Sequence, residues 1–294
     1  MNDRLAWLAD ERIKDEVRQR VATKLNQNER NEWGYHWEML ARAAQLPPPG
    51  SWRVWLVMAG RGFGKTRAGA EWVRMIAEEH KDARIALVSA SLAEARSVMV
   101  EGESGVIACA PHDRCPVFEA SLRRVRFPNG AQAQLFSAAE PESLRGPQFS
   151  HAWCDEIGKW PLSNDRAIRA WDNLLMGLRL GHNPRIAATT TPRAVPLLKR
   201  LMKGEEEGTV AVTRGSTFEN AAHLPKRFLE AIDAEFGGSQ LARQEIAGEM
   251  LTDLEGALWR RHTLERAREE SGVVDFRRIV IAVDPPIGSS GDEC

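Results

Sequence analysis

The sequence predicts an α/β protein built on a parallel β-sheet with helices on both faces. Several short apolar runs are continuous rather than alternating, which is typical of strands buried on both sides. Between these runs lie longer segments in which apolar residues recur at helical spacing. The predicted strands are 54–58, 83–90, 149–154, 185–191 and 210–213, and the predicted helices are 67–76, 91–100, 164–180 and 195–203. This alternation of strands and helices favours a three-layer fold.

The bulk properties of the chain narrow the classes of protein to which it can belong. Its 294 residues allow one large domain or two smaller ones, and a hydrophobic share of 43% is enough for a sizeable core. The net charge of −1 gives no support for a nucleic-acid partner, so a role on DNA would need local basic patches or neighbouring subunits. Four cysteines without CxxC spacing indicate reduced thiols in the cytoplasm. We expect neither a membrane span nor a secretion signal.

A glycine-rich loop, residues 59–66, joins the first predicted strand to its helix and ends in Gly-Lys-Thr. Strand, glycine loop and helix in this order are typical of a P-loop, whose backbone N–H groups surround a phosphate at a helix N-terminus. Lys65 would reach the β- and γ-phosphates, and the Thr66 hydroxyl would ligate Mg²⁺. A purely structural turn is the alternative. The predicted nucleotide-binding residues are Gly60, Arg61, Gly62, Phe63, Gly64, Lys65 and Thr66.

Two adjacent carboxylates, Asp155 and Glu156, end the predicted strand 149–154. In an ATPase with a P-loop, the first acid at such a strand end holds Mg²⁺ and the second polarises the attacking water as general base. Adjacent side chains point to opposite sides of an extended chain, so the two acids need not compete for one role. Their place at the carboxyl end of a strand strengthens this interpretation, because α/β sheets carry their sites there.

Two further stretches carry candidate residues for phosphate chemistry. Arg145 lies in an exposed Arg-Gly-Pro loop, where its guanidinium would act as an arginine finger or simply cap a surface carbonyl. Arg61, inside the glycine loop, is a second candidate for charge compensation within the same chain. Thr189, Thr190 and Thr191 end a predicted strand, so their hydroxyls would report the state of the γ-phosphate or merely reflect a β-branched strand terminus.

The remaining segments divide the chain into an arm, a lid and the start of another domain. Residues 3–30 are charged and helix-prone, with one apolar stripe, and the aromatic residues of 33–55 would either pack in the core or stack on a nucleotide base. Helices at 225–236 and 241–250 form a possible lid. A new apolar strand then ends at Asp284, only ten residues before the end of the sequence, so we expect a second domain to be cut off there.

Taken together, these stretches resemble the large terminase subunit of tailed phages, the motor that packages DNA into capsids. The resemblance runs from about residue 33 to the end, and its combination of motifs is more specific than any single one. It implies an ASCE-type P-loop ATPase core, followed by a lid and by a nuclease domain with an RNase H-like fold. The matching stretches are 52–56 leading into 60–66, then 143–149, 153–156, 189–193 and 248–259.

The resemblance implies a role for each matching residue. Lys65 and Thr66 would be the Walker A pair, and Asp155 and Glu156 the Walker B acid and the catalytic glutamate. The threonines 189–191 would be the coupling motif. Arg145 matches the arginine that some family members insert into the neighbouring subunit's site, which favours the finger over the capping role. Asp284 would be the first metal-binding acid of the nuclease, whose other acids lie beyond residue 294.

The same resemblance implies cofactors and partners. We expect ATP and Mg²⁺ in the ATPase, a divalent metal for the nuclease of a full-length form, and no DNA cleavage by this chain. The expected partners are double-stranded DNA, the portal protein and procapsid, the small terminase subunit and further copies in a homo-oligomeric ring, in the host cytoplasm. The expected domains are an arm with a possible adenine-side segment (1–50), the ATPase core (51–213), lid and linker (214–273) and the start of the nuclease (274–294).

Two alternatives belong to other classes of protein. A prophage remnant would bind nucleotide or a partner without turnover. A helicase-like P-loop ATPase would act on nucleic acid, but the acid-ended strand at 277–284 and the threonine strand placed before a lid argue against it.

Overall fold

The computed structural model of the chain describes residues 32–236 and 240–250, together with isolated positions between 16 and 29. The chain divides into two compact units, residues 1–251 and 252–294, and the second lies wholly outside the described residues. The predicted nuclease strand with Asp284 therefore lies outside the described part, as does most of the predicted arm helix.

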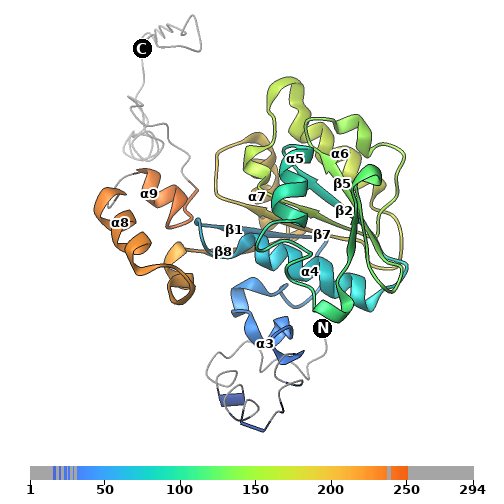
Figure 1. Ribbon diagram of the computed structural model, residues 1–294. Coiled ribbons are helices and arrows are strands. Elements are labelled where there is room, and N and C mark those ends of the chain that lie inside the picture. The colour runs from blue at the N-terminus through green and yellow to red at the C-terminus, as the bar shows by residue number, and fades with distance from the viewer. Residues whose placement is uncertain are drawn as a thin grey trace, which may run out of the picture. The chain divides into compact units, whose positions relative to one another are not determined.

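The described residues form one eight-stranded sheet in the order β3-β4-β5-β2-β6-β7-β1-β8 (Figure 1). All strands from β5 to β8 in this order run parallel, and β3 and β4 add an antiparallel edge. The predicted α/β class is confirmed. The strands are β1 (Val54–Ala59), β2 (Arg84–Ser89), β3 (Val117–Glu119), β4 (Arg124–Arg126), β5 (Gln132–Ser137), β6 (His151–Cys154), β7 (Arg185–Thr190) and β8 (Val210–Gly215).

Helices cover both faces of the sheet, which gives the predicted three layers. Successive side chains of a strand point to opposite faces. In β1, Trp55 therefore packs in the cluster that holds α4, whereas Leu56 packs in the cluster that holds α6 and α7. The helices are α3 (Trp37–Leu40), α4 (Lys65–Glu79), α5 (Leu92–Glu94), α6 (Arg166–Gly177), α7 (Pro196–Glu206), α8 (Lys226–Phe236) and α9 (Gln240–Glu245).

β4 and β5 form a hairpin around Asn129-Gly130, because they pair in antiparallel register on either side of it. The short strand β3 on its outer side was not predicted. The predicted helix 91–100 consists of α5 followed by a π-helical stretch, Ala95–Val100. Ser91 caps α5 by accepting a hydrogen bond from the Glu94 N–H, but no capping box is completed, because the Glu94 carboxylate lies 3.4 Å from the Ser89 hydroxyl.

The predicted helix 241–250 is shorter than expected, since α9 ends at Glu245. Gly248 has a φ of +73°, which favours glycine and stops a right-handed helix. A Cβ at Gly248 would lie 2.5 Å from the Gly215 carbonyl oxygen, and one at Gly60 would lie 2.2 Å from the Ile246 carbonyl oxygen. The end of α9 is therefore held against the glycine loop that follows β1.

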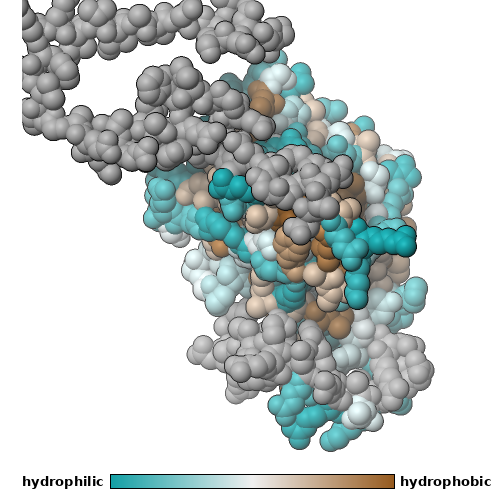
Figure 2. Space-filling model, turned by 90° about the vertical axis from the view of Figure 1, so that its left-hand side faces the viewer, coloured by the Kyte–Doolittle hydropathy of each residue, from teal (hydrophilic) through white to brown (hydrophobic). Residues whose placement is uncertain are grey.

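Figure 2 views the side of the molecule that faces left in Figure 1, where hydrophobic residues gather between hydrophilic ones. Within the described part of the chain, no helix has the length and apolar character that crossing a bilayer requires.

Candidate active site

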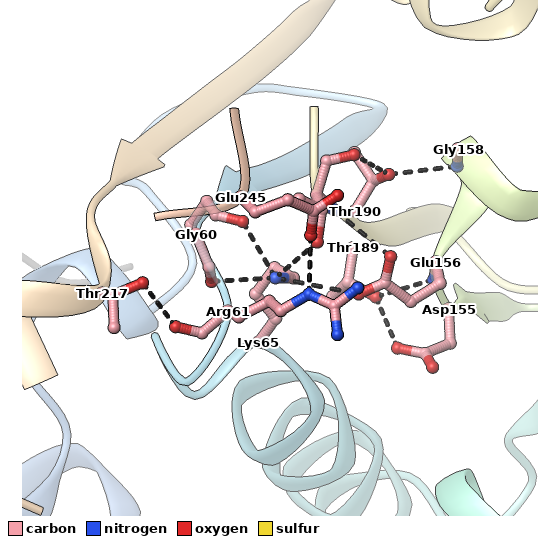
Figure 3. A network of polar contacts seen from close by, with 12 residues as sticks. Gly60, Arg61, Lys65, Asp155, Glu156, Gly158, Thr189, Thr190, Thr217 and Glu245 are labelled. Atoms are coloured by element: carbon pink, nitrogen blue, oxygen red, sulfur yellow. Dashed lines mark hydrogen bonds and ion pairs between the residues drawn. The ribbon is translucent and has the colours of Figure 1, made fainter. Parts of the chain in front are cut away.

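The candidate site lies at the carboxyl ends of three adjacent strands, β6, β7 and β1. The glycine loop leaves β1, the two acids follow β6, and the threonines end β7 (Figure 3). The register places Met58 of β1 opposite Thr190, and Cys154 of β6 opposite Ala188. Parallel strands thus bring together residues that are from 34 to 126 positions apart in sequence.

The glycine loop has the backbone shape that a phosphate-binding loop needs. Gly62 and Gly64 have φ values of +71° and +95°, in the left-handed region that favours glycine. The helix α4 begins at Lys65, so the N–H groups of its first turn have no carbonyl partner within the helix. Phe63 is fully buried in the core, so its side chain packs inward and only its backbone remains available to a nucleotide.

Lys65 is the buried cation of the site, with 7% of its surface exposed. Its ammonium donates hydrogen bonds to the carbonyl oxygens of Ala59 (2.9 Å) and Gly60 (3.0 Å) and to the Thr191 hydroxyl (3.3 Å). Burial lowers the pKa of Lys65, while Glu156 and then Asp155 oppose that shift. The ammonium is thus held between the glycine loop and the end of β7.

Asp155 is 4% exposed, and its carboxylate accepts a hydrogen bond from the Thr189 hydroxyl at 2.7 Å. Burial, and to a smaller extent the negative charge of Glu156, raises the pKa of Asp155 to about 6, although the hydrogen bond from Thr189 lowers it. At neutral pH the carboxylate is therefore mostly ionised, and a nearby cation would stabilise its negative charge.

Glu156 has a left-handed backbone, with φ 45° and ψ 52°, which is uncommon for a residue with a Cβ. Its carboxylate accepts a hydrogen bond from the Thr191 N–H at 3.3 Å and lies 3.7 Å from the Lys65 ammonium. Its own N–H points to the Thr189 hydroxyl at 3.4 Å. The two acids are therefore both bonded to the end of β7.

The chain beyond Glu156 is also tied to this strand end. The Gly158 N–H donates to the Thr190 hydroxyl at 3.0 Å, and a Cβ at Gly158 would lie 2.7 Å from the same hydroxyl. Trp160 is 1% exposed, and its indole N–H donates to the Asp155 carbonyl at 3.1 Å. Each of the predicted threonines thus has at least one partner in the segment 155–158 or in Lys65.

Arg61 lies at the outer side of the loop, with 64% of its side chain exposed. Its guanidinium forms an ion pair of 2.6 Å with the Glu245 carboxylate of α9, and the Arg61 backbone N–H donates a hydrogen bond to the Glu245 backbone carbonyl at 2.7 Å. The Glu245 hydrogen bond and charge raise the pKa of Arg61. Thr217 and Asn220 add hydrogen bonds to the carbonyls of Arg61 (2.6 Å) and Gly62 (2.7 Å).

The segment before β1 also touches the loop. Gln45 is buried, and its side-chain amide donates to the Gly64 carbonyl at 3.4 Å. The Arg42 guanidinium donates to the Phe63 carbonyl and stacks 4.4 Å from the Phe63 ring centroid. Among the aromatic residues of this segment, Trp37, Trp52 and Trp55 are buried, which supports a packing role for them rather than base stacking.

Arg145 is not gathered into the site of its own chain. It follows a 3₁₀ turn after β5, is 70% exposed, and forms an ion pair of 3.0 Å with Glu142, which also binds Arg169. In the sheet, β5 is separated from β1 by three strands. The predicted exposure of Arg145 is thus observed.

The structure brings together most of the predicted site, namely Lys65, Asp155, Glu156, Arg61 and the three threonines. Sequence reasoning missed Glu245, Arg42 and Gln45, because their pairing with the loop depends on tertiary contacts across 19 to 184 residues. The one available signal for Glu245 was the nearby Gly248-Glu249, part of a stretch that the resemblance had already singled out.

The residues present fit Mg²⁺, a cation that prefers oxygen ligands and bound nucleotide phosphates. The Thr66 hydroxyl has no protein partner among the described residues, and it lies in the first turn of α4 beside the loop. The Asp155 carboxylate accepts one hydrogen bond from the Thr189 hydroxyl, and burial destabilises its negative charge. A divalent cation between these two groups would offset that cost.

The sequence matches a family model described as the terminase large subunit, T4likevirus-type, N-terminal, over residues 56–266. The chain belongs to the large terminase family. A search of curated proteins found no match.

Solved structures of other terminases share the fold. The large terminase of a thermophilic bacteriophage, in complex with ADP, has a TM-score of 0.58 at 11% identity, over 75% of this chain and 52% of that one. The HK97 bacteriophage large terminase has a TM-score of 0.53 at 15% identity, over 69% and 47%. The ATPase domain of the Thermus phage P74-26 large terminase has a TM-score of 0.51 at 14% identity, over 69% and 90%. This terminase chain thus spans about half the length of the first two of these relatives.

Proposed function

We propose that this terminase chain is a Mg²⁺-dependent ATPase that drives double-stranded DNA into a phage procapsid. The observation that carries the proposal is the convergence of Lys65, Asp155 and Glu156 beside a phosphate-binding loop. Relatives of the same fold have been solved with ADP and with ATP-γ-S, which supports a nucleotide as the ligand of this loop.

The loop and Lys65 would hold the triphosphate. The free N–H groups at the start of α4 and the Lys65 ammonium would bind the β- and γ-phosphate oxygens, because both carry positive charge toward the same point. Thr66 and Asp155 would hold Mg²⁺, which neutralises charge that develops on the phosphates. Because burial raises the pKa of Asp155 to about 6, a bound cation would stabilise its ionised form further.

Glu156 would orient and deprotonate the attacking water as general base. Its carboxylate is engaged by the Thr191 N–H and faces Lys65, so the geometry with nucleotide must release it toward the γ-phosphate. Thr189 and Thr191 bind Asp155, Glu156 and Lys65, and this set of bonds supports a coupling role for the end of β7. A change at the γ-phosphate would alter these bonds and thereby move the strand end.

Arg145 would act on a neighbouring subunit. Four strand spacings separate β5 from β1, which at about 4.8 Å each amounts to roughly 19 Å. That span favours insertion into the site of the next copy over contact with the phosphates of the same chain. It therefore supports a ring of subunits, with the portal, the procapsid and the small terminase subunit as the further expected partners. Arg61 is the alternative charge-compensating residue, acting within the chain.

The nuclease part of the prediction rests on the family alone. The full-length form would cleave DNA with a divalent metal bound by Asp284 and further acids. The proposed boundaries of core, lid and nuclease at 51–213, 214–273 and 274–294 belong to the same expectation. Host cytoplasm is the compartment in which such a motor would meet its procapsid.

Steady-state ATP hydrolysis across a protein concentration series tests the proposal, with Glu156→Ala as the inactive control. We expect turnover that rises with protein concentration, because a finger from a neighbour completes each site. Loss of the general base should lower turnover by about 10² to 10⁴-fold while nucleotide binding is kept. Turnover that is independent of protein concentration, yet lost in Glu156→Ala, would assign the charge-compensating role to Arg61 instead of Arg145. Absence of hydrolysis in both proteins, with portal and DNA added, would favour the remnant.

A further inference from the structure

A cavity of about 980 Å³ lies at the amino ends of the strands, at the edge of the sheet opposite the candidate active site. Its walls come from the C-terminal part of α4, the loop 180–183 and the segment 47–52 before β1. His151 and Arg185, the first residues of β6 and β7, form its floor. The two residues are register partners, so their side chains leave the sheet on the same face.

Arg185 is a cation without a counter-charge in the described part of the chain. Its guanidinium stacks 4.3 Å from the Trp52 ring centroid, and its Nε is buried with no hydrogen-bond partner among those residues. Its Nη2 makes only a long contact of 3.4 Å with the Gly50 carbonyl there. Among the described residues no carboxylate lies within ion-pair distance of it, and burial lowers its pKa. A guanidinium in this state gains strongly from an anion that enters the cavity.

His151 forms the other part of the floor. It is 8% exposed, its Nδ1 lies 3.1 Å from the Ser150 hydroxyl, and the His80 ring stacks on it with centroids 6.3 Å apart. Burial, and to a smaller extent the charges of His80 and Arg185, lowers the pKa of His151 to about 4. An anion bound beside Arg185 would reverse part of this effect, so His151 can report on the occupancy of the cavity.

The rim of the cavity has the opposite charge. Glu38, Glu79 and Asp82 are exposed there, accompanied by Lys81 and His182. A DNA duplex presents phosphates along its whole length, so this acidic rim would repel it before any phosphate reached the floor. A single carboxylate flanked by basic residues matches both the cationic floor and the acidic rim.

We propose that this cavity is a docking site for a protein segment, whose glutamate or aspartate side chain pairs with Arg185. Apolar groups of the segment would pack on Trp52 and Trp72, and its flanking lysines or arginines would face the acidic rim. The bidentate geometry of an arginine–carboxylate pair would fix the orientation of the segment. This inference concerns the opposite edge of the sheet and does not depend on the proposed ATPase activity.

The test is an NMR titration at constant ionic strength, with isotope-labelled histidines in the protein, that follows the resonance of His151. The probes are acetate, a lysine-flanked glutamate peptide, its glutamine analogue and a short DNA duplex, and a His151→Asn variant assigns the reporting resonance. We expect acetate and the glutamate peptide to shift the His151 resonance in a saturable way and to raise its pKa. The peptide should bind with a Kd on the order of 1 mM or lower, and its glutamine analogue at least tenfold more weakly.

Arg185→Gln should weaken the binding of the glutamate peptide at least tenfold. The matched control is Arg53→Gln, which removes a cation at the same edge of the sheet that instead donates to the Leu175 carbonyl at 3.3 Å, and it should leave binding unchanged. Equal affinity for the two peptides, equal affinity in Arg185→Gln, or no saturable shift with acetate or the glutamate peptide would overturn the proposal. Tighter binding of the duplex than of the glutamate peptide would replace it with a nucleic-acid site.

Discussion

The two halves of the candidate active site are built in different ways. In the inner half, Lys65 and Asp155 are 7% and 4% exposed, and each is bonded to a neighbouring strand end. The outer half consists of the two candidate charge-compensating arginines. Arg61, beside the loop, has a side chain that is 64% exposed, and Arg145, which we propose to act on a neighbouring subunit, has one that is 70% exposed. Their partners, Glu245 and Glu142, belong to α9 and to a surface turn. The sheet therefore positions the inner groups before any ligand arrives, whereas the outer groups remain free to change partners.

This difference has an energetic side. Burying the charges of Lys65 and Asp155 costs free energy, and the attraction between them offsets only part of that cost. Their buried positions therefore favour catalysis and lower the stability of the fold. Exposed ion pairs of the outer half contribute little to the fold, typically under about 1 kcal/mol each. The inner half should therefore show large effects on both turnover and stability, and the outer half should show effects on turnover alone.

Arg145→Ala is the change with the largest expected effect on turnover. Loss of an arginine finger should lower ATP hydrolysis by about 10³-fold or more, with nucleotide affinity kept, because the finger stabilises charge only in the transition state. The matched control is Arg169→Ala, which removes the other arginine that binds Glu142 and should leave turnover near normal. Unchanged hydrolysis in Arg145→Ala would assign the outer half no catalytic role at this position.

Lys65→Ala should lower turnover by on the order of 10² to 10³-fold and weaken nucleotide binding as well, since a preorganised donor is lost from ground and transition state alike. Lys159→Ala is the control, because Lys159 is an exposed lysine whose charge also reaches Asp155 and Lys65. Hydrolysis and fluorescent-nucleotide titrations measure both quantities. Equal losses in the two variants would show that net charge, rather than the buried position, matters.

Asp155→Asn should lower turnover and stabilise the nucleotide-free protein by about 1–3 kcal/mol at pH 8. The folded pKa of Asp155, about 6, exceeds its ordinary value of 3.8, so the folded state holds the proton more tightly. Wild-type stability must therefore fall as the pH rises between these values, and the gain in the variant should vanish below pH about 4.

Denaturant unfolding of both proteins at several pH values, with chelator present, measures this gain in stability. Asp172→Asn serves as a control, because Asp172 is an exposed carboxylate paired with Arg200 at 2.6 Å. A loss of stability in Asp155→Asn at pH 8 would mean that the inner half is satisfied without a metal.

The smallest effect is expected for the ion pair between Arg61 and Glu245. A double-mutant cycle with Arg61→Gln and Glu245→Gln should give a coupling free energy under about 1 kcal/mol, because the arginine is largely exposed and solvent screens the pair. Thermal or denaturant unfolding measures it. A coupling well above that value would place Arg61 with the preorganised inner half.

Sequence alone predicted the inner half well, for a physical reason. Each of its motifs sits at the end of a continuous apolar run, and parallel strands must bring their carboxyl ends to the same edge of the sheet. The positions of Lys65, Asp155 and Thr189 followed from that rule. The sequence does not predict the left-handed backbone of Glu156 or the hydrogen bond that its carboxylate accepts from the Thr191 N–H, because both depend on the surrounding atoms.

The outer half and the helix ends were harder to predict. Glu245 reaches Arg61 only because α9 stops early and Gly248 turns the chain back toward the loop, which helical periodicity does not reveal. The π-helical stretch after Glu94 escaped for a similar reason, since its apolar spacing resembles that of an ordinary helix. The roles of Arg145 and Asp284 remain predictions.

The close approach of Gly60, Gly215 and Gly248 limits how this chain can be altered. A Cβ at any of the three would meet other atoms at 2.2 to 2.5 Å, two of them main-chain carbonyl oxygens and one the Phe63 ring. Main-chain atoms cannot rotate aside as a flexible side chain can. A library randomised at these three codons should therefore return glycine almost every time, and a chimaera that exchanges any of the three segments with another terminase would have to keep glycine at all three positions.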